Sequence, residues 1–312
     1  RHISRPVDMI KAKATNADYN DFPLSDIPDY GWKRRSSPFY NRFIRAEEGY
    51  NHYINMDRKH PETGDTLMNH LKHLNYENSL KQLMEFYGKP PFFSSEKRMV
   101  NKSVDIGTLP IRIMQIYRTM TEAKSLEEFV CASGILVHYL ADASTPAHLS
   151  WYFHDKNADH RYSETMTEIF DDDMFKIRER QEYIIDGARE YLRKNSIQAF
   201  HKTVLESIIK HLKDTYINLY DVDANIEQEK LWNQYRSQIT RSLARGMKLT
   251  AELWEKAWVE NPNRYNWIIK DVDIAKMNKL WQSPTFIPSD TLSWATAEIA
   301  HEARIETVFA SI

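Results

Sequence analysis

The sequence predicts an all-α protein, a compact multi-helix domain, on three observations. Glycine makes up only 8 of 312 residues, well below the usual share of about 7%, and all-β sandwiches and barrels need many glycine-rich turns. Apolar residues recur at spacings of three and four through most of the chain after Thr63, which is the period of an amphipathic helix. A hydrophobic fraction of 42% and a charged fraction of 28% argue against wholesale disorder.

The charge and cysteine counts exclude several function classes. Lys and Arg number 42 against 44 Asp and Glu, so the net charge is −2. This balance provides no field for capturing polyanions, which weakens an assignment as a nucleic-acid-coating protein. The single cysteine, Cys131, excludes an internal disulfide and a cysteine-based zinc site. Its apolar neighbours predict a small core residue.

The first part of the chain is expected to be irregular. Residues 1–60 contain scattered prolines and aromatic side chains, although residues 1–20 could hold one short helix. The chain begins with Arg1, shows no signal peptide and contains no apolar run of the about 18 residues that a membrane span needs. We therefore expect a processed or trimmed start and no membrane span. A helix is predicted from about Thr63 until residues 88–91, where two successive prolines end it.

The central part of the sequence predicts two consecutive helices. The first runs from Pro110, which suits a first helical turn, to about Ala123. Ser125 and Glu128 then form a capping box, which opens a long helix that includes Leu140. Because that second helix is apolar on most faces, we expect it to be central and buried.

The remaining chain is expected to be helical with interruptions. After a loop that includes Pro146 and residues 155–159, helical periodicity resumes at about Tyr162 and continues to Trp258. Breaks are expected near Asn195 and residues 221–225.

The C-terminal part of the sequence predicts one further helix. Residues 261–263 close the long helical region, and the last fifty residues contain one clear helix candidate, 290–309. The sequence is therefore divided into a helical domain, 1–261, and a C-terminal extension, 262–312, packed on the same domain.

One segment concentrates the residue types that bind metal ions. His138 and Asp142 are four residues apart, and so are His160 and Glu164, so each pair projects from one face of a helix. A neutral imidazole and a carboxylate at that spacing can bind one cation. A buried His–Asp hydrogen bond is the alternative for the first pair. Two pairs with His148 between them favour a polynuclear zinc site, because buried charge without compensation is costly.

The order His-x3-Asp-x5-His-x11-His-x3-Glu, from His138 to Glu164, resembles the zinc-dependent phospholipase C and single-strand nuclease superfamily, in its bacterial phospholipase C-like branch. Upstream, a Pro-Asp pair that ends at Asp29, followed by the segment from His52 to Asp57, is similar to the "P-D … H-[FY]-x-D" ligand pair of that branch. The resemblance covers roughly residues 20–260. It implies an all-α phospholipase C/nuclease-like domain around a polynuclear zinc cluster.

Carried over residue by residue, the resemblance implies two to three zinc ions. The first ion would be held by Asp29, His52, His138 and Asp142, and the second by His148, His160, Glu164 and water, with Asp142 bridging the first ion to a third. A ligand set of nitrogen and oxygen atoms with an open position suits catalytic zinc. Asp29 would also assist deprotonation of the attacking water, although its basicity is reduced when it binds a metal.

Two points stay open at the first and third ions. Asp18 competes with Asp29, because its segment also resembles the aspartate segment of some members. Members normally begin the mature chain with a Trp that ligates the third zinc, whereas this chain has Arg1, with His2 as the nearby histidine.

The resemblance implies a zinc-dependent phosphodiesterase that cleaves phospholipid head groups by a metal-activated water. Trp151, Tyr152 and Phe153 are expected either to wall an apolar substrate groove beside the metals or to belong to the core. The alternatives are a single-strand nuclease or nucleotidase, whose usual Gly-Gly-Asn stretch is absent here, and a non-catalytic zinc-stabilised binding protein.

The expected partners follow from the same resemblance. They are a phospholipid or another phosphodiester substrate and peripheral contact with a membrane, with no stable nucleic-acid complex. The resemblance also implies a secreted or periplasmic protein.

Overall fold

The computed structural model describes residues 23–33, 48–59, 63–72, 79–87, 106–151, 174–195, 203–217, 228–267 and 272–310. Regular structure in these residues is helical, apart from an isolated antiparallel bridge between Lys59 and Thr66. The predicted all-α class is therefore confirmed. Among the described helices, none combines the length and the apolar character that crossing a membrane requires.

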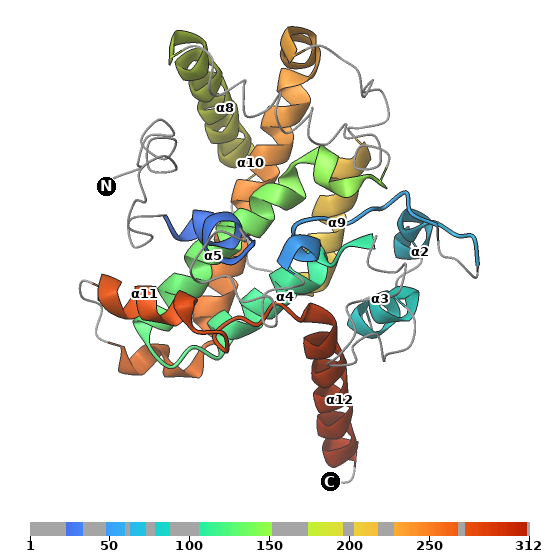
Figure 1. Cartoon of the computed structure of the whole chain (residues 1–312), viewed down its shortest axis with the longest axis vertical. Helices are drawn as coiled ribbons and strands as arrows, with labels where there is room; N and C mark the ends of the chain where they lie inside the picture. Colours follow the sequence, from blue (N-terminus) through green and yellow to red (C-terminus); the bar gives the residue numbers. More distant parts are fainter. Residues whose placement is uncertain are drawn as a thin grey trace.

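The helices follow one another as shown in Figure 1, with η marking short turns of 3-10 or π type. The N-terminal elements are η2 (Leu24–Asp26), η3 (Pro28–Lys33), η4 (Glu48–His52), α2 (Leu67–Lys72) and α3 (Ser79–Tyr87). The central elements are α4 (Leu109–Thr121), α5 (Leu126–Ser144), η7 (Pro146–Leu149), α8 (Met174–Lys194) and α9 (Val204–Tyr216). The C-terminal elements are α10 (Gln228–Glu260), η9 (Pro262–Asn266), α11 (Ile274–Gln282) and α12 (Thr291–Ala310).

Helix α5 lies at the centre of the molecule (Figure 1) and packs against α4, α9, α10 and α11. Its side chains Cys131, Ile135 and Tyr139 are completely buried, as the sequence predicted for this helix. Burial raises the pKa of the Cys131 thiol to about 12, so this cysteine is an unreactive core residue. The two turns η2 and η4 also contact α5, which brings the N-terminal segments onto the same helix.

The capping box at the start of α5 forms with one difference from the expected pattern. The Ser125 hydroxyl accepts a hydrogen bond from the backbone N–H of Glu128 at 3.3 Å. The Glu128 carboxylate accepts one from the backbone N–H of Lys124 at 2.7 Å, one residue before the cap. Two backbone donors at the helix start are thus satisfied.

The expectation of irregular structure in residues 1–60 needs correction in the described part. Residues 24–33 and 48–52 form the turns η2, η3 and η4. Ile27 is completely buried and Trp32 is 1% exposed. Such short turns do not form on their own, so packing against the rest of the protein stabilises them. They are also too short to show a hydrophobic period in the sequence, which is why they were not predicted.

The expectation of one helix in the last fifty residues also needs correction. Helix α11 precedes the predicted one, and Asp273 caps it by accepting from the backbone N–H of Lys276 at 3.1 Å. Its buried residues are Met277 and Trp281. Helix α11 has nine residues, and two of them are buried. This hydrophobic pattern is too short to assign a helix from its period.

Other boundaries agree with the sequence. Helix α8 ends at Lys194, next to the break predicted near Asn195, and α10 ends at Glu260. The domain division after residue 261 stays a prediction. Several expectations lie outside the described residues: the helix in 1–20, the breaks at 88–91 and 221–225, the loop 155–159 and the renewed helix at Tyr162.

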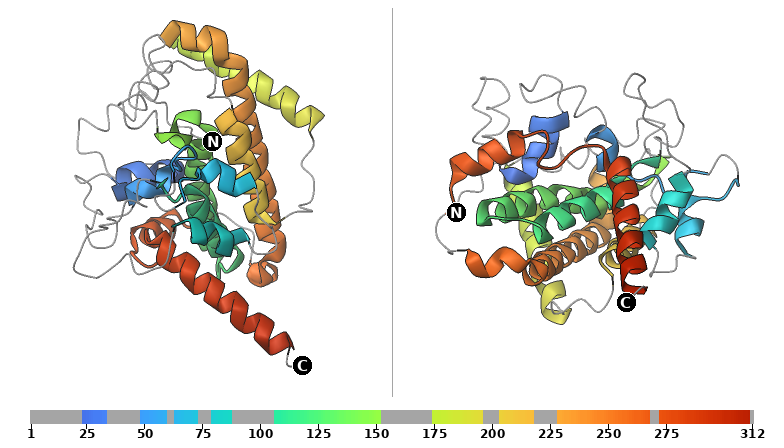
Figure 2. Two further views of the ribbon diagram at one scale, coloured as in Figure 1. Left: turned by 90° about the vertical axis from the view of Figure 1, so that its right-hand side faces the viewer. Right: turned by 90° about the horizontal axis from the view of Figure 1, so that it is seen from below.

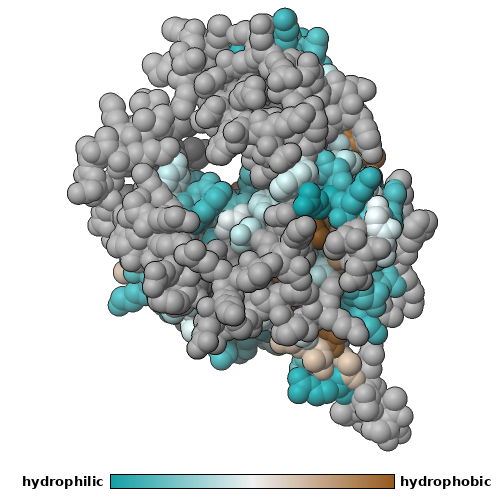
Figure 3. All heavy atoms as spheres, turned by 45° about the vertical axis from the view of Figure 1, so that its right-hand side comes forward, coloured by the Kyte–Doolittle hydropathy of each residue, from teal (hydrophilic) through white to brown (hydrophobic). Residues whose placement is uncertain are grey.

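The C-terminal helix α12 leads away from the body and carries the C-terminus at its far end (Figures 1 and 2). Its first part contacts α3 and α4, and Leu292 and Ala295 are buried there. On the face drawn in Figure 3, the described surface is mostly hydrophilic, with small separate hydrophobic patches.

A tight turn at Gly107 directly precedes α4 and packs against the η4 segment. Gly107 has a φ of +77°, and a Cβ built on it would lie 2.1 Å from the carbonyl oxygen of Tyr53. The next two backbone N–H groups donate to the η4 segment, Thr108 to Tyr50 at 2.8 Å and Leu109 to Tyr53 at 3.2 Å. Only glycine allows both the left-handed conformation and this close approach.

A buried serine–histidine pair connects α5 to α9. The Ser144 hydroxyl donates to the carbonyl of Leu140 at 2.6 Å, so its oxygen accepts from Nε2–H of His211 at 3.0 Å. Burial, together with the Arg245 cation, lowers the pKa of His211 from its ordinary 6.5 to about 3. His211 is therefore a neutral hydrogen-bond donor in the folded protein.

We predict that Gly107→Ala lowers the free energy of unfolding by at least about 3 kcal/mol, because it combines a strained φ with overlap against a backbone carbonyl. Gly64→Ala is the matched control. Gly64 also has a positive φ, of 69°, but no described atom lies within 4 Å of its built Cβ, so a loss of about 1 kcal/mol is expected. Chemical denaturation measures both losses, and equal losses would contradict the close approach.

We also predict that His211 makes the protein less stable in mild acid. Below pH 6.5 the unfolded chain protonates this imidazole, whereas the folded chain does so only near pH 3. The stability contributed by His211 is therefore complete above pH 6.5 and falls with pH, by about 2 kcal/mol at pH 5. Denaturation at pH 7 and pH 5 should show a steeper loss in the wild type than in His211→Gln, and an identical pH dependence would disprove the assignment.

Candidate metal centre

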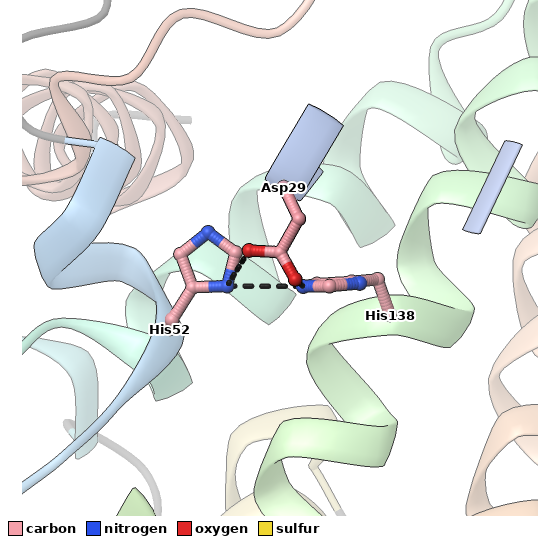
Figure 4. A group of neighbouring side chains, drawn as sticks. All are labelled: Asp29, His52 and His138. Carbon is pink, nitrogen blue, oxygen red and sulfur yellow. Dashed lines mark hydrogen bonds and ion pairs between the residues drawn. The ribbon is translucent and has the colours of Figure 1, made fainter. Parts of the chain in front are cut away.

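Three segments that are far apart in the sequence bring metal-binding side chains together (Figure 4). Asp29 comes from η3, His52 ends η4 and His138 comes from the middle of α5. One ligand atom from each of these three side chains lies within 4.8 Å of the other two. The structure thus brings together three of the four residues expected around the first zinc.

The fourth residue, Asp142, lies one helical turn after His138 on α5 and faces the two histidine nitrogens. Its Oδ2 is 3.0 Å from Nδ1 of His52 and 3.4 Å from Nε2 of His138. These two nitrogens are 3.0 Å from each other. Asp29 completes the group, with one oxygen 3.9 Å from the His52 nitrogen and the other 3.9 Å from the His138 nitrogen.

A backbone contact determines which nitrogen of His138 faces the group. Nδ1 of His138 lies 2.8 Å from the carbonyl oxygen of Ser25, which can only accept a hydrogen bond, so Nδ1 carries the proton. Nε2 therefore presents its lone pair to His52, Asp142 and Asp29. Histidines that bind metals characteristically make such a contact through the second ring nitrogen.

The spacing and chemistry of the four predicted ligands suit zinc. Ligand atoms placed tetrahedrally at zinc–nitrogen and zinc–oxygen bond lengths lie about 3.3 Å apart. The distances that join the two imidazole nitrogens to each other and to Asp29 and Asp142 run from 3.0 to 3.9 Å. The carboxylate oxygens and Nε2 of His138 are all hydrogen-bond acceptors. A neutral His52 can donate only one N–H to this group, so hydrogen bonds alone leave most of these acceptors facing one another. Two carboxylates and two imidazoles without sulfur suit zinc.

The ionisation states also suit a cation. Burial disfavours the charged form of Asp142, but the neighbouring His138, His148 and His52 together outweigh burial and hold the pKa of Asp142 well below its ordinary value. Burial raises the pKa of Asp29 as well, yet His138 and His52 lower it on balance. Burial lowers the pKa of His52. The site therefore presents carboxylates and a neutral His52, the forms that bind metal.

The centre has a closed side and an open side. The side chain of His52 is 2% exposed, whereas that of Asp29 is 46% exposed. Lys33, also 46% exposed, places its Nζ 3.4 Å from Oδ1 of Asp29. Solvent therefore reaches the group past Asp29 and Lys33, and His52 and α5 form its base.

The second oxygen of Asp142 points to a further predicted ligand. Oδ1 of Asp142 is 3.8 Å from Nε2 of His148. The short turn η7 that carries His148 is tied to the chain after His52: Ile54 N–H donates to the His148 carbonyl and Met56 N–H to the Leu149 carbonyl, both at 2.9 Å. Asp142 thus lies between the first group and His148, whereas the resemblance implied that it bridges the first ion to a third.

Sequence reasoning assigned no role to Asp57, although this residue ends the segment that starts at His52. Its carboxylate accepts hydrogen bonds from the Ser150 hydroxyl and from the backbone N–H of Trp151, both at 2.6 Å. The guanidinium of Arg58 lies 4.4 Å from the centre of the Trp151 ring. Asp57 therefore holds the chain that follows His148. The motif spacing places its aspartate at position 55, which is Asn55 here, so it did not single out Asp57.

Trp151 is half-buried and follows η7 directly. The other predicted site residues, His160, Glu164, Tyr152 and Phe153, lie outside the described part of the chain, as do the alternatives Asp18 and His2.

Comparison with known proteins gives one curated relative of low identity. A probable serine protease of Bradyrhizobium tropiciagri is 24% identical over 332 residues, covering 88% of this chain and 41% of that protein. The chain therefore spans about two fifths of the length of that relative. No solved structure matches the chain significantly.

A family model gives the stronger result. The model described as zinc-dependent phospholipase C matches residues 24–218, which is more than half of the chain. The matched region begins after Asp18 and contains all seven predicted metal ligands, from Asp29 to Glu164. Together with the helical fold and the convergence of Asp29, His52 and His138, the match places this protein: the chain belongs to the zinc-dependent phospholipase C family.

Proposed function

We propose that this protein is a zinc-dependent phosphodiesterase that cleaves phospholipid head groups, releasing diacylglycerol and a phosphorylated alcohol. The observation that carries the proposal is the convergence of Asp29, His52 and His138 on one point, with Asp142 beside the two histidines, in a chain of the zinc-dependent phospholipase C family. When bound there, zinc supplies a Lewis acid for a phosphate oxygen and lowers the pKa of a water.

The side chains of the first group have distinct roles in this proposal. His52, His138 and Asp142 are less exposed than Asp29, so they form the base and hold the ion. Asp29 is the half-exposed member, so it is the carboxylate that incoming water and substrate meet, and it accepts the proton of the attacking water. Lys33 lies beside Asp29 at the same opening, where its cation attracts the phosphate group.

We propose that a second ion binds on the other side of Asp142, whereas the resemblance gave Asp142 as the bridge from the first ion to a third. His148 faces that side, and His160 and Glu164 supply the remaining protein ligands, as the resemblance implies. Two ions that share Asp142 would bind two oxygens of one phosphodiester, which stabilises both the attacking and the leaving oxygen. A third ion stays a proposal of the same resemblance.

The proposed substrate wall begins at Trp151. Its ring contacts Arg58, so a flat apolar surface and a cation lie next to each other three residues after His148. With Tyr152 and Phe153, Trp151 would border the lipid part of the substrate, in peripheral contact with a membrane. Since the net charge is −2, no stable nucleic-acid complex is proposed. We also propose a secreted or periplasmic location, as the resemblance implies.

Serine protease chemistry, suggested by the name of the curated relative, receives no support from the Ser144–His211 pair. A nucleophilic serine must give its proton to the histidine. Here the Ser144 hydroxyl donates to the Leu140 carbonyl, and His211 is the donor toward Ser144. Both side chains are also buried, at 3% and 5% exposure, so no substrate reaches them.

We predict that the wild-type protein binds at least two zinc ions per chain after reconstitution, and that Asp142→Asn lowers zinc affinity by more than about 100-fold. Even groups that only support a ligand contribute 10- to 100-fold, and Asp142 faces both ions. Asp214→Asn, on the exposed side of α9 next to Lys210, is the matched control and should bind zinc normally. Elemental analysis measures the zinc content, and chelator competition measures the zinc affinity. Fewer than one zinc per wild-type chain would refute the metal centre.

We predict that zinc-loaded protein hydrolyses short-chain phosphatidylcholine faster than single-stranded DNA, and that Asp29→Asn lowers kcat at least about 100-fold, the contribution of a proton acceptor. Side-by-side assays of both substrates provide the measurement. Turnover of DNA without turnover of lipid would place the protein in the nuclease branch. Zinc binding without turnover of either substrate would favour a non-catalytic binding protein.

A further inference from the structure

We propose that the C-terminal segment 281–291 is a positioning element of the metal centre. This segment lies beyond residue 218, where the family match ends. It contacts the turns that carry Asp29 and His52, the two proposed ligands of the first ion that α5 does not carry. The proposal rests on the zinc site proposed above and adds to it the part of the chain that holds these two ligands in place.

Asn51, the residue before His52, is the main connection. Its Oδ1 accepts from the hydroxyls of Thr108 at 2.7 Å and Thr291 at 3.2 Å. Its Nδ2 donates to the Ser289 carbonyl at 3.1 Å and to Oε1 of Glu48 at 3.4 Å. These four hydrogen bonds use the whole capacity of the amide. Asn51 is completely buried, and Ser289 and Thr291 are 2% and 3% exposed.

A buried ion pair forms the second connection. Nη2 of Arg112 donates to both oxygens of Glu48, at 2.9 and 3.0 Å, and neither side chain is exposed. Nη1 of Arg112 donates to the carbonyl of Pro288 at 2.6 Å, and Nε2 of Gln115 donates to the same oxygen at 3.0 Å. Glu48 begins the turn that His52 ends, so this pair joins the C-terminal segment to the turn η4.

The third connection reaches the turn that carries Asp29. Nε1 of Trp32 donates to the carbonyl of Trp281 at 2.9 Å. A Cβ on Gly31 would lie 3.1 Å from the Trp281 ring, so α11 packs directly on η3. Both Trp32 and Trp281 are 1% exposed.

The physical reason for such support is the shortness of the two turns. With six and five residues, η3 and η4 are too short to hold their own conformation. Helix α5 fixes the positions of His138 and Asp142 internally, whereas Asp29 and His52 depend on what their turns pack against. Loosening the C-terminal segment should therefore weaken zinc binding more than it weakens the fold.

The test uses two substitutions of Thr291 in the full-length protein. Thr291→Val keeps the shape and removes the hydroxyl that bonds Asn51, whereas Thr291→Ser keeps the hydroxyl. Thr121→Val is the matched control, because Thr121 is buried on α4 and its hydroxyl donates to the Arg118 carbonyl. Zinc affinity is measured by chelator competition, the ligand geometry by the visible spectrum of the cobalt(II) form, and stability by chemical denaturation.

We expect Thr291→Val to weaken zinc binding about tenfold, the lower end of the effect of supporting groups, and to change the cobalt spectrum. Thr291→Ser should behave as the wild type, and Thr121→Val should lose stability without losing zinc affinity. Equal affinities of Thr291→Val and wild type, or an equal loss in Thr121→Val, would overturn the positioning role while leaving the metal centre intact. Absence of zinc binding by the wild type would overturn both proposals.

Discussion

The buried ion pair between Glu48 and Arg112 is the interaction around which the metal centre is assembled. Both side chains are completely enclosed, and leaving either charge unpaired would cost about 3–5 kcal/mol. The Tyr139 hydroxyl also donates to Glu48, while Arg112 binds the carbonyl of Pro288. The pair therefore requires η4, α4, α5 and the C-terminal segment to meet at one place, one turn from His52.

The proposed ligands divide into those that one helix fixes and those that packing delivers. His138 and Asp142 share a face of α5, so their separation follows from helix geometry. Asp29 and His52 arrive from separate turns and meet them within hydrogen-bonding or ion-pair distance. Two carboxylates and two imidazoles this close together carry negative charge that a bound cation would offset, and zinc suits this set of donors.

The parts of the fold that the sequence predicted are those with strong local signals. The start of α5 has a capping residue and an apolar helical period, and both act as expected around Ser125. Helix α4 begins one residue from its predicted start at Pro110. By contrast, α11 and the turns η3 and η4 depend on burying Trp281, Trp32 and Asn51 against distant segments. Short elements of this kind leave no period to read.

The sequence by itself determined the all-α class, the central helix and the spacing of His138 and Asp142, because these follow from composition and from the repeat of one helix. Only the tertiary structure decided that Asp29 and His52 reach that helix and that the Ser25 carbonyl orients His138. These contacts join residues more than 80 positions apart. His52 and His138, for example, are separated by 86 positions in the sequence. Packing across such separations depends on how the whole chain folds, so no local pattern encodes it.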